Sequence, residues 1–113
     1  NSGFTIPEEL EAALEHVRTH YSEVIRIGDL GKLVGLSVSA FERKFKKHFR
    51  MSPTEYIRRV RMHEACRRLI HRSEPISTIA QECGFSDQSH FTREFARVMR
   101  TTPAVYRRDH GFA

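Results

Sequence analysis

The chain has 113 residues, of which 39% are hydrophobic and 29% are charged, and its formal net charge is +5. This composition argues against a membrane protein, because no apolar run of about 18 residues is present and no signal peptide is visible. The 2 cysteines, Cys66 and Cys83, lack the spacing of a disulfide framework and indicate core thiols in a reducing compartment. We therefore expect a cytoplasmic protein of one domain, or of two small domains that share a linker.

The N-terminal half predicts three helices. Thr5–Glu8 has the pattern of a capping box, and the helix that it opens carries an apolar stripe at helical spacing: Leu10, Ala13, Leu14 and Val17. A second helix is expected from Ile27 to Val34, with three side chains facing the core: Leu30, Leu33 and Val34. Gly35 ends this helix, and a third helix is expected from Val38 to Phe49.

The C-terminal half begins with a long predicted helix. Ser52–Glu55 forms another capping box, and the helix extends to Arg72 with core contacts from Ile57, Val60, Ala65, Cys66, Leu69 and Ile70. Three elements complete the chain: a short helix over 76–83, a helix over 88–99 after the turn at Gly84, and a last turn after Pro103. The sequence thus predicts an all-α fold in three parts: a first subdomain over 1–52, a linker helix over 53–72 and a second subdomain over 73–113.

One sequence pattern occurs twice. The first copy consists of Ile27, Gly35, Ser37, Phe41, Arg43, Phe45, Arg50, Pro53, Tyr56 and Arg58, and the second of Ile76, Gly84, Ser86, Phe91, Arg93, Phe95, Arg100, Pro103, Tyr106 and Arg108. The offset is 49 residues up to the serine and 50 after it, so the second copy carries one extra residue near Asp87–Gln88.

Each copy has the spacing of a helix-turn-helix. Two helices that cross steeply need a small residue where they touch and a glycine with positive φ where the chain reverses. The residues in these roles are Gly31 and Gly35 in the first copy and Ala80 and Gly84 in the second, with Ser37 and Ser86 expected to cap the following helices. Two generic helical hairpins from an old duplication are the alternative.

The outer helix of each copy is basic on one side. Residues 27–72 hold 12 basic and 4 acidic residues, which suits a polyanion such as nucleic acid. Helical periodicity places Phe41, Phe45 and Phe49 inward in the first copy, and Phe91, Phe95, Val98 and Met99 inward in the second. The outward residues are Ser39, Arg43, Lys46, Lys47 and Arg50, and then Ser89, Arg93, Ala96, Arg97 and Arg100.

These outward faces fit the DNA major groove, which admits one α-helix and in which arginine can donate two hydrogen bonds to guanine. Arg43 and Arg93 are therefore predicted to contact bases. Four further cations either bind phosphate or remain solvated: Lys46, Lys47, Arg50 and Arg97. A linker helix of about 20 residues spans roughly 30 Å, which is close to the separation of successive major grooves.

With these residues, the chain resembles the DNA-binding domain of the AraC/XylS family of bacterial transcription regulators. The resemblance covers about Ile27 to Arg108, and its most specific residues are Ile76, Ala80, Cys83, Gly84, Phe85, Ser86, Ser89, His90, Phe91, Arg93, Phe95, Thr102, Pro103, Tyr106 and Arg107. It implies about seven helices in two helix-turn-helix subdomains joined by a long helix. It also implies sequence-specific binding of double-stranded DNA.

The resemblance further implies individual roles. Base contacts are expected from Ser39, Glu42 and Arg43 in the first copy and from Gln88, Ser89, His90 and Arg93 in the second, with Thr92 and the helix N-termini, at Ser37 and Ser86, on phosphates. Recruitment of RNA polymerase is implied, as is a separate ligand-sensing or dimerising domain. The chain starts at Asn1 without a methionine, so we expect it to be a fragment of a longer protein. Gly31 stands where the family usually has alanine, and we expect it to loosen the first subdomain.

Other functional classes predict features that this sequence lacks. An enzyme such as a small nuclease needs clustered acids or a nucleophile with a base, whereas the acids here are scattered, so neither an enzymatic activity nor a cofactor is expected. His16 and His20 lie four residues apart, as metal ligands can, but no third ligand has a matching spacing, so no metal is expected. A helical protein-interaction module differs from a DNA-binding module in predicting no salt-dependent affinity for DNA.

Overall fold

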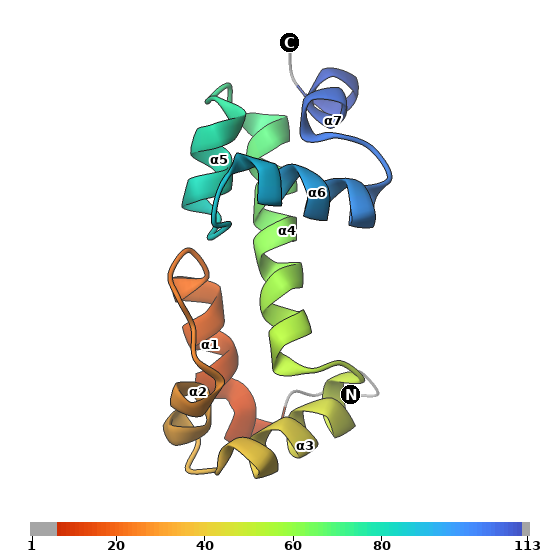
Figure 1. Cartoon of the computed structure of the whole chain (residues 1–113). Helices are drawn as coiled ribbons and strands as arrows, with labels where there is room; N and C mark the ends of the chain where they lie inside the picture. The colour runs from red at the N-terminus through yellow and green to blue at the C-terminus, as the bar shows by residue number, and fades with distance from the viewer. Residues whose placement is uncertain (1–6, 112–113) are drawn as a thin grey trace. The chain divides into compact units, whose positions relative to one another are not determined.

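The computed structural model describes residues 7–111, and every regular element in that range is helical (Figure 1). The elements in chain order are a 3₁₀ turn, η1 (Glu8–Leu10), and the helices α1 (Glu11–His20), α2 (Ile27–Leu33), α3 (Val38–Phe49), α4 (Pro53–His71), α5 (Ile76–Glu82), α6 (Gln88–Met99) and α7 (Pro103–His110). The predicted all-α fold with seven helices is confirmed, and the expected turn after Pro103 is a full helix. The predicted cap at Thr5 lies outside the described residues.

The chain divides into two compact units, Asn1–Val60 (unit 1) and Arg61–Ala113 (unit 2). The division lies inside α4, which therefore supplies side chains to two separate cores. Of the core residues expected on this helix, Ile57, Ala65 and Leu69 are buried, whereas Val60, Cys66 and Ile70 are only partly buried. The sequence reasoning missed Met62, which is 8% exposed.

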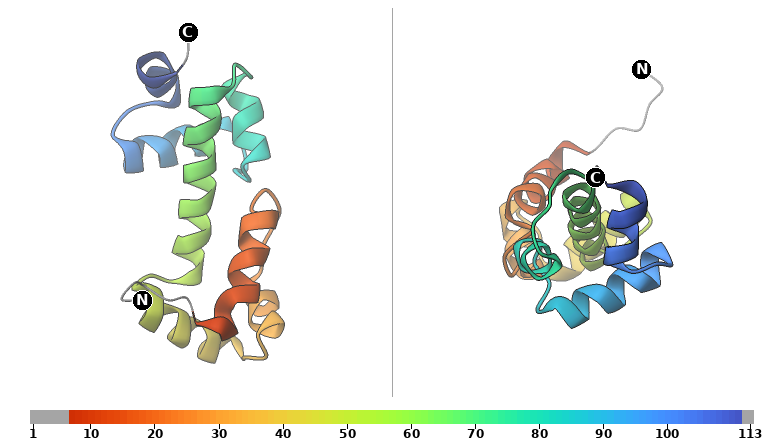
Figure 2. Two further views of the ribbon diagram at one scale, coloured as in Figure 1. Left: turned by 180° about the vertical axis from the view of Figure 1, so that it is seen from behind. Right: turned by 90° about the horizontal axis from the view of Figure 1, so that it is seen from above.

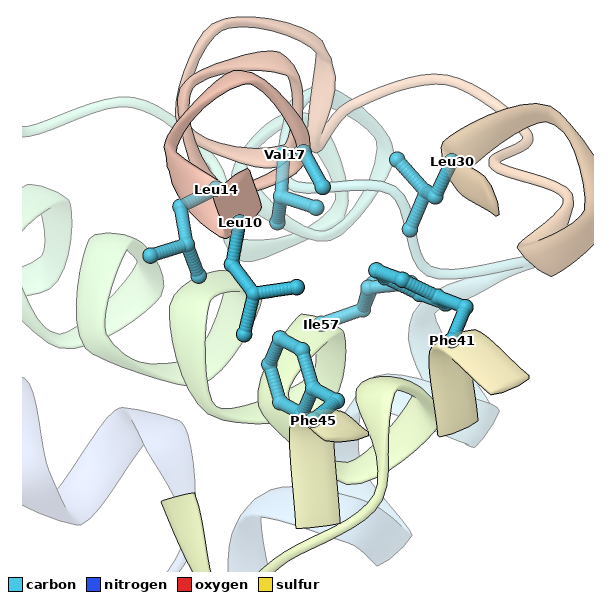
Figure 3. Packing of buried hydrophobic residues seen from close by; sticks show 8 residues of the cluster. Leu10, Leu14, Val17, Leu30, Phe41, Phe45 and Ile57 are labelled. Atoms are coloured by element: carbon cyan, nitrogen blue, oxygen red, sulfur yellow. The ribbon is translucent and has the colours of Figure 1, made fainter. Parts of the chain in front are cut away.

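The core of unit 1 is formed by helices that meet around two phenylalanines. Phe41 and Phe45 of α3 lie opposite the leucines of η1 and α1, with Leu30 of α2 and Ile57 of α4 closing the cluster (Figure 3). The two rings are tilted, with centroids 5.7 Å apart. Burial of phenylalanine removes a large apolar area from water, so these residues dominate the stability of the unit.

The core of unit 2 is built in the same way around Phe91 and Phe95 of α6, which are both fully buried. Helices α5 and α7 lie on either side of the C-terminal half of α4 (Figure 2). The guanidinium of Arg107 on α7 donates hydrogen bonds to the carbonyl oxygens of Leu69 at 3.4 Å and Arg72 at 3.1 Å. These bonds satisfy acceptors that the end of α4 would otherwise leave free.

An ionic cluster joins α4 to α5 within unit 2. The Glu64 carboxylate accepts hydrogen bonds from Arg67 and from Arg68, whose Nε lies 3.1 Å away, and Arg68 also pairs with Glu82 of α5. Hydrogen bonds from Arg67 and Arg68 lower the pKa of Glu64 to about 2, although burial acts in the opposite direction. The side chains of Glu64 and Arg68 are only 16% and 13% exposed, so the pair is shielded from solvent.

Two predicted core residues are exposed instead. Leu33 is 50% exposed and Val98 is 48% exposed. Both lie in the last turn of a helix, where the next residue packs against the core in their place: Val34 after Leu33, and Met99 after Val98. The core of unit 2 follows the four-residue steps Phe91, Phe95 and Met99, and Val98 lies beside that line.

Candidate nucleic-acid interface

The turn between the two helices of each motif has the predicted backbone geometry. Gly35 has a φ of 71° and Gly84 a φ of 91°, in the left-handed region that favours glycine. In unit 1, Leu36 N donates to the carbonyl of Gly31 at 2.9 Å, and in unit 2, Phe85 N donates to that of Ala80 at 3.0 Å. The same turn therefore follows α2 and α5.

Gly31 lies closer to the backbone of the following turn than the sequence suggested. A Cβ at this position would lie 2.7 Å from the carbonyl oxygen of Leu36, which belongs to the backbone of the turn and cannot easily move aside. The expectation that Gly31 loosens the first subdomain is wrong, because the missing side chain permits the close contact of α2 with the turn.

The caps of the two outer helices differ. Ser37 Oγ accepts a hydrogen bond from Ala40 N at 3.2 Å, which confirms the predicted cap of α3. At α6, however, the Asp87 carboxylate accepts from His90 N at 2.7 Å, so the predicted Ser86 cap is wrong. The extra residue of the second copy moves Asp87 into the cap position, and a carboxylate there interacts well with the positive end of the helix dipole. That insertion in the repeat was the signal that could have identified Asp87.

The outward face of α3 is exposed and basic. Solvent reaches every site residue predicted in this motif: Ser37, Ser39, Glu42, Arg43, Lys46, Lys47 and Arg50. Among residues 7–111, the four cations of this set have no acidic partner, whereas Lys44, on the inner side of the helix, pairs with Glu9. The face thus presents four positive charges, none of which forms an ion pair within residues 7–111, beside the one carboxylate of Glu42.

The outward face of α6 has a different distribution of charge. Gln88, Ser89, Arg93 and Arg97 are exposed, as is Ser86 before the helix, and His90 and Thr92 are partly buried. Arg97 donates to Glu94 at 2.9 Å, whereas Arg93 has no acidic partner in the described part of the chain. Arg93 therefore remains the cation most available to an external acceptor on this helix.

His90 has one ring nitrogen turned inward. Its ring packs edge-on against Phe85, with centroids 5.8 Å apart, and its Nδ1 is buried without a hydrogen-bond partner among the described residues. The ring is therefore held by the core of unit 2, and Nε2 is the nitrogen left for contact with an outside group.

The remaining candidate residues have structural surroundings. Cys66 and Cys83 are free thiols, and burial raises the pKa of Cys83 to about 11 and also raises that of Cys66, so both are poor nucleophiles. The rings of His16 and His20 stack with centroids 4.1 Å apart. Within residues 7–111 no group of three His, Cys, Asp or Glu side chains could hold a metal ion, and no helix there could cross a lipid bilayer.

Comparison with known proteins distinguishes the two interpretations of the repeat, which are a pair of generic helical hairpins and a pair of helix-turn-helix motifs. The helix-turn-helix domain family matches residues 30–109, which is most of the chain. In structure, the chain is similar to an AraC-type transcriptional regulator from Chromobacterium violaceum, with a TM-score of 0.84, 27% identity, and coverage of 90% of this chain and 91% of that one. The chain belongs to the AraC-type helix-turn-helix family.

Two further similarities concern individual proteins. The chain is 36% identical over 98 residues to the HTH-type transcriptional activator RhaS of Pectobacterium carotovorum. The matched region covers 87% of this chain but only 35% of that protein. Its fold is also that of the DNA-binding domain of AdpA, solved in complex with a target DNA, with a TM-score of 0.85, 22% identity, and coverage of 91% and 93% of the two chains. AraC-type relatives are regulators of transcription and not enzymes, in agreement with the sequence analysis.

Proposed function

We propose that this chain binds specific sites on double-stranded DNA as the DNA-binding domain of a bacterial transcription regulator, with α3 and α6 as its two recognition helices. One observation supports this above all: the same turn occurs twice, and each time it is followed by a helix whose outward arginine, Arg43 or Arg93, has no acidic partner in residues 7–111. An unpaired guanidinium on an exposed helix face can donate two hydrogen bonds to guanine in the major groove.

Around these two arginines we assign further contacts. Base edges are met by Ser39, Glu42 and Arg43 from α3, and by Gln88, Ser89, His90 and Arg93 from α6. Phosphates are met by Ser37, Lys46, Lys47, Arg50, Ser86, Thr92 and Arg97. Glu42 would repel phosphate, so its role is to accept from a cytosine amine or to orient Arg43.

The proposal extends to the arrangement on DNA. The 19 residues of α4 correspond to about 28 Å of helix at 1.5 Å per residue, so one continuous helix can link contacts in successive major grooves. We assign residues 1–52 and 73–113 to the two DNA-binding subdomains and 53–72 to the linker helix between them. A DNase footprint that covers a single groove would contradict this arrangement.

The remaining parts of the proposal concern the whole protein. This chain matches only about a third of the length of relatives such as RhaS. We propose that it acts in the cytoplasm, recruits RNA polymerase to activate transcription, and is joined to a separate effector-binding or dimerisation domain. The activator named among its relatives supports this role.

A binding titration with the wild-type chain and Arg93→Ala tests the function. The wild-type affinity should fall steeply as salt increases, because each neutralised phosphate releases counterions. Arg93→Ala should cost about 1–3 kcal/mol on a site selected from random oligonucleotides and should relax preference at one base pair. Arg18→Ala is the matched control, since it also removes one positive charge but lies on α1, where Arg18 pairs with Glu11 and Glu15.

Two results would contradict the proposal. Equal losses for Arg93→Ala on specific and random DNA would show that Arg93 does not read a base. A wild-type affinity that does not depend on salt would favour the protein-interaction module instead.

A further inference from the structure

Both recognition helices end in an arginine with an unusual backbone conformation. Arg50, at the end of α3, has a φ of 59°, and Arg100, at the end of α6, has a φ of 61°. They are the only residues other than glycine with positive φ in the described range 7–111. This left-handed conformation brings Cβ close to a carbonyl oxygen, so glycine or asparagine usually occupies it.

The backbone on either side makes this conformation necessary. Arg50 N donates to the carbonyl of Lys46 at 2.8 Å, and Arg100 N to that of Ala96 at 3.0 Å, so each residue closes the last turn of its helix. Two residues later, Ser52 and Thr102 already cap the next helix, ahead of a buried proline. The chain must reverse at one residue in each unit, and glycine would do this at lower cost.

No ion pair within the described residues explains the presence of the two arginine side chains. Both are exposed, and neither pairs with an acidic group in the described part of the chain. Each follows the proposed base-reading arginine by seven residues, from Arg43 to Arg50 and from Arg93 to Arg100. Seven residues are about two helical turns, so the two cations lie on the same side of the helix roughly 10 Å apart along its axis. The major groove is about 12 Å wide, so a cation at this distance reaches the phosphates that border it.

We propose that Arg50 and Arg100 form a matched pair of phosphate contacts, one at the end of each recognition helix, and that the chain accepts an unfavourable backbone conformation to keep a guanidinium there. This inference rests on the proposed DNA binding. It adds Arg100 to the phosphate contacts and gives both positions a role that glycine could not fill. The competing explanation is a structural one, in which each cation stabilises the negative end of the helix dipole.

The two explanations differ in what a glycine substitution does. In the full chain, Arg50→Gly and Arg100→Gly should raise the thermal midpoint, because glycine relieves the backbone, yet each should weaken binding to a selected duplex roughly 5- to 20-fold and reduce the salt slope by about 1. The loss should be equal on random DNA, since phosphates carry no sequence information. Arg50→Ala and Arg100→Ala should lose the same affinity without the gain in midpoint, and Arg50→Lys and Arg100→Lys should keep most of the salt slope.

Arg18→Ala on α1 again serves as the control for a lost charge. Glycine variants that bind DNA like the wild type would overturn the inference while leaving the proposed function intact. A lower midpoint in the glycine variants would overturn it too, in favour of the helix dipole. If the wild-type chain itself shows no salt-dependent binding, the proposed function fails first.

Discussion

The two units have the same backbone design but different polar groups around it. Both have a glycine turn, a pair of buried phenylalanines on the recognition helix and a left-handed arginine before the next cap. Unit 1 leaves four cations of α3 without acidic partners in residues 7–111, whereas unit 2 pairs Arg97 with Glu94 and holds α4 to α5 through the Glu64 cluster. The duplicated fold thus depends on the core and the turn, while the charged groups are free to diverge, so unit 1 is expected to contribute more of the salt dependence of DNA binding.

The largest expected loss of stability comes from removing a buried phenylalanine, and it should be confined to the unit that loses the ring. Phe45→Ala and Phe95→Ala should each cost about 3–5 kcal/mol, because each removes a buried ring and leaves a cavity. Each unit has its own cluster, so hydrogen exchange should accelerate mainly in unit 1 for Phe45→Ala and in unit 2 for Phe95→Ala. Equal acceleration in both units for either variant would show that the two cores unfold as one.

Acid should destabilise unit 2 before unit 1. The pKa of Glu64 is lowered from 4.5 to about 2 in the folded chain, so its contribution to stability is present above the unfolded value and is lost as the pH falls toward 2. The shielded cluster should contribute on the order of 2–3 kcal/mol at neutral pH. NMR spectra recorded between about pH 5 and pH 2 should lose the signals of unit 2 first.

Glu64→Gln provides the control for this titration. It should lower stability at neutral pH, because Arg68 loses one charged partner, but it should flatten the acid dependence of unit 2. An unchanged acid profile in Glu64→Gln would mean that a different carboxylate causes the loss.

The small residue at the helix contact should respond differently in the two units. Gly31→Ala should cost about 1–3 kcal/mol, because the new Cβ would lie 2.7 Å from the Leu36 carbonyl oxygen. Ala80→Gly makes the opposite change at the equivalent place and should cost about 1 kcal/mol, since glycine weakens a helix interior. Chemical denaturation of both variants measures these costs. A neutral Gly31→Ala would show that the turn of unit 1 can open as far as that of unit 2.

The sequence was most informative where the period of the helix and the chemistry of the turn agree. Val38–Phe49 and Gln88–Met99 were predicted at their observed bounds because each combines a preceding glycine turn, a phenylalanine stripe and a following proline, although the cap predicted for the second helix was the wrong residue. Prediction failed at helix ends, where Leu33 and Val98 have helical spacing but the residues that follow them, Val34 and Met99, pack against the cores instead. It also failed for Gly31, since the 2.7 Å that would separate a Cβ there from the Leu36 carbonyl oxygen depends on a crossing distance that no residue pattern encodes. The outward faces of the candidate site were predicted, but the Arg97–Glu94 pair was not, because either residue could have extended into solvent.

The smallest expected effect tests the difference in the caps. Ser37→Ala and Asp87→Ala should each cost about 1 kcal/mol, because each leaves a backbone N–H of the first helical turn without its acceptor. Ser86→Ala, at the position that repeats Ser37 in the sequence, should change the stability by less than about 0.5 kcal/mol. Asp87→Asn should keep the cap while removing a negative charge next to the proposed DNA-binding face, so it should bind DNA more tightly at low salt with little change in thermal midpoint. If thermal denaturation showed a larger loss of stability for Ser86→Ala than for Asp87→Ala, Ser86 would be the cap of α6. The extra residue of the second copy would then not have changed the cap.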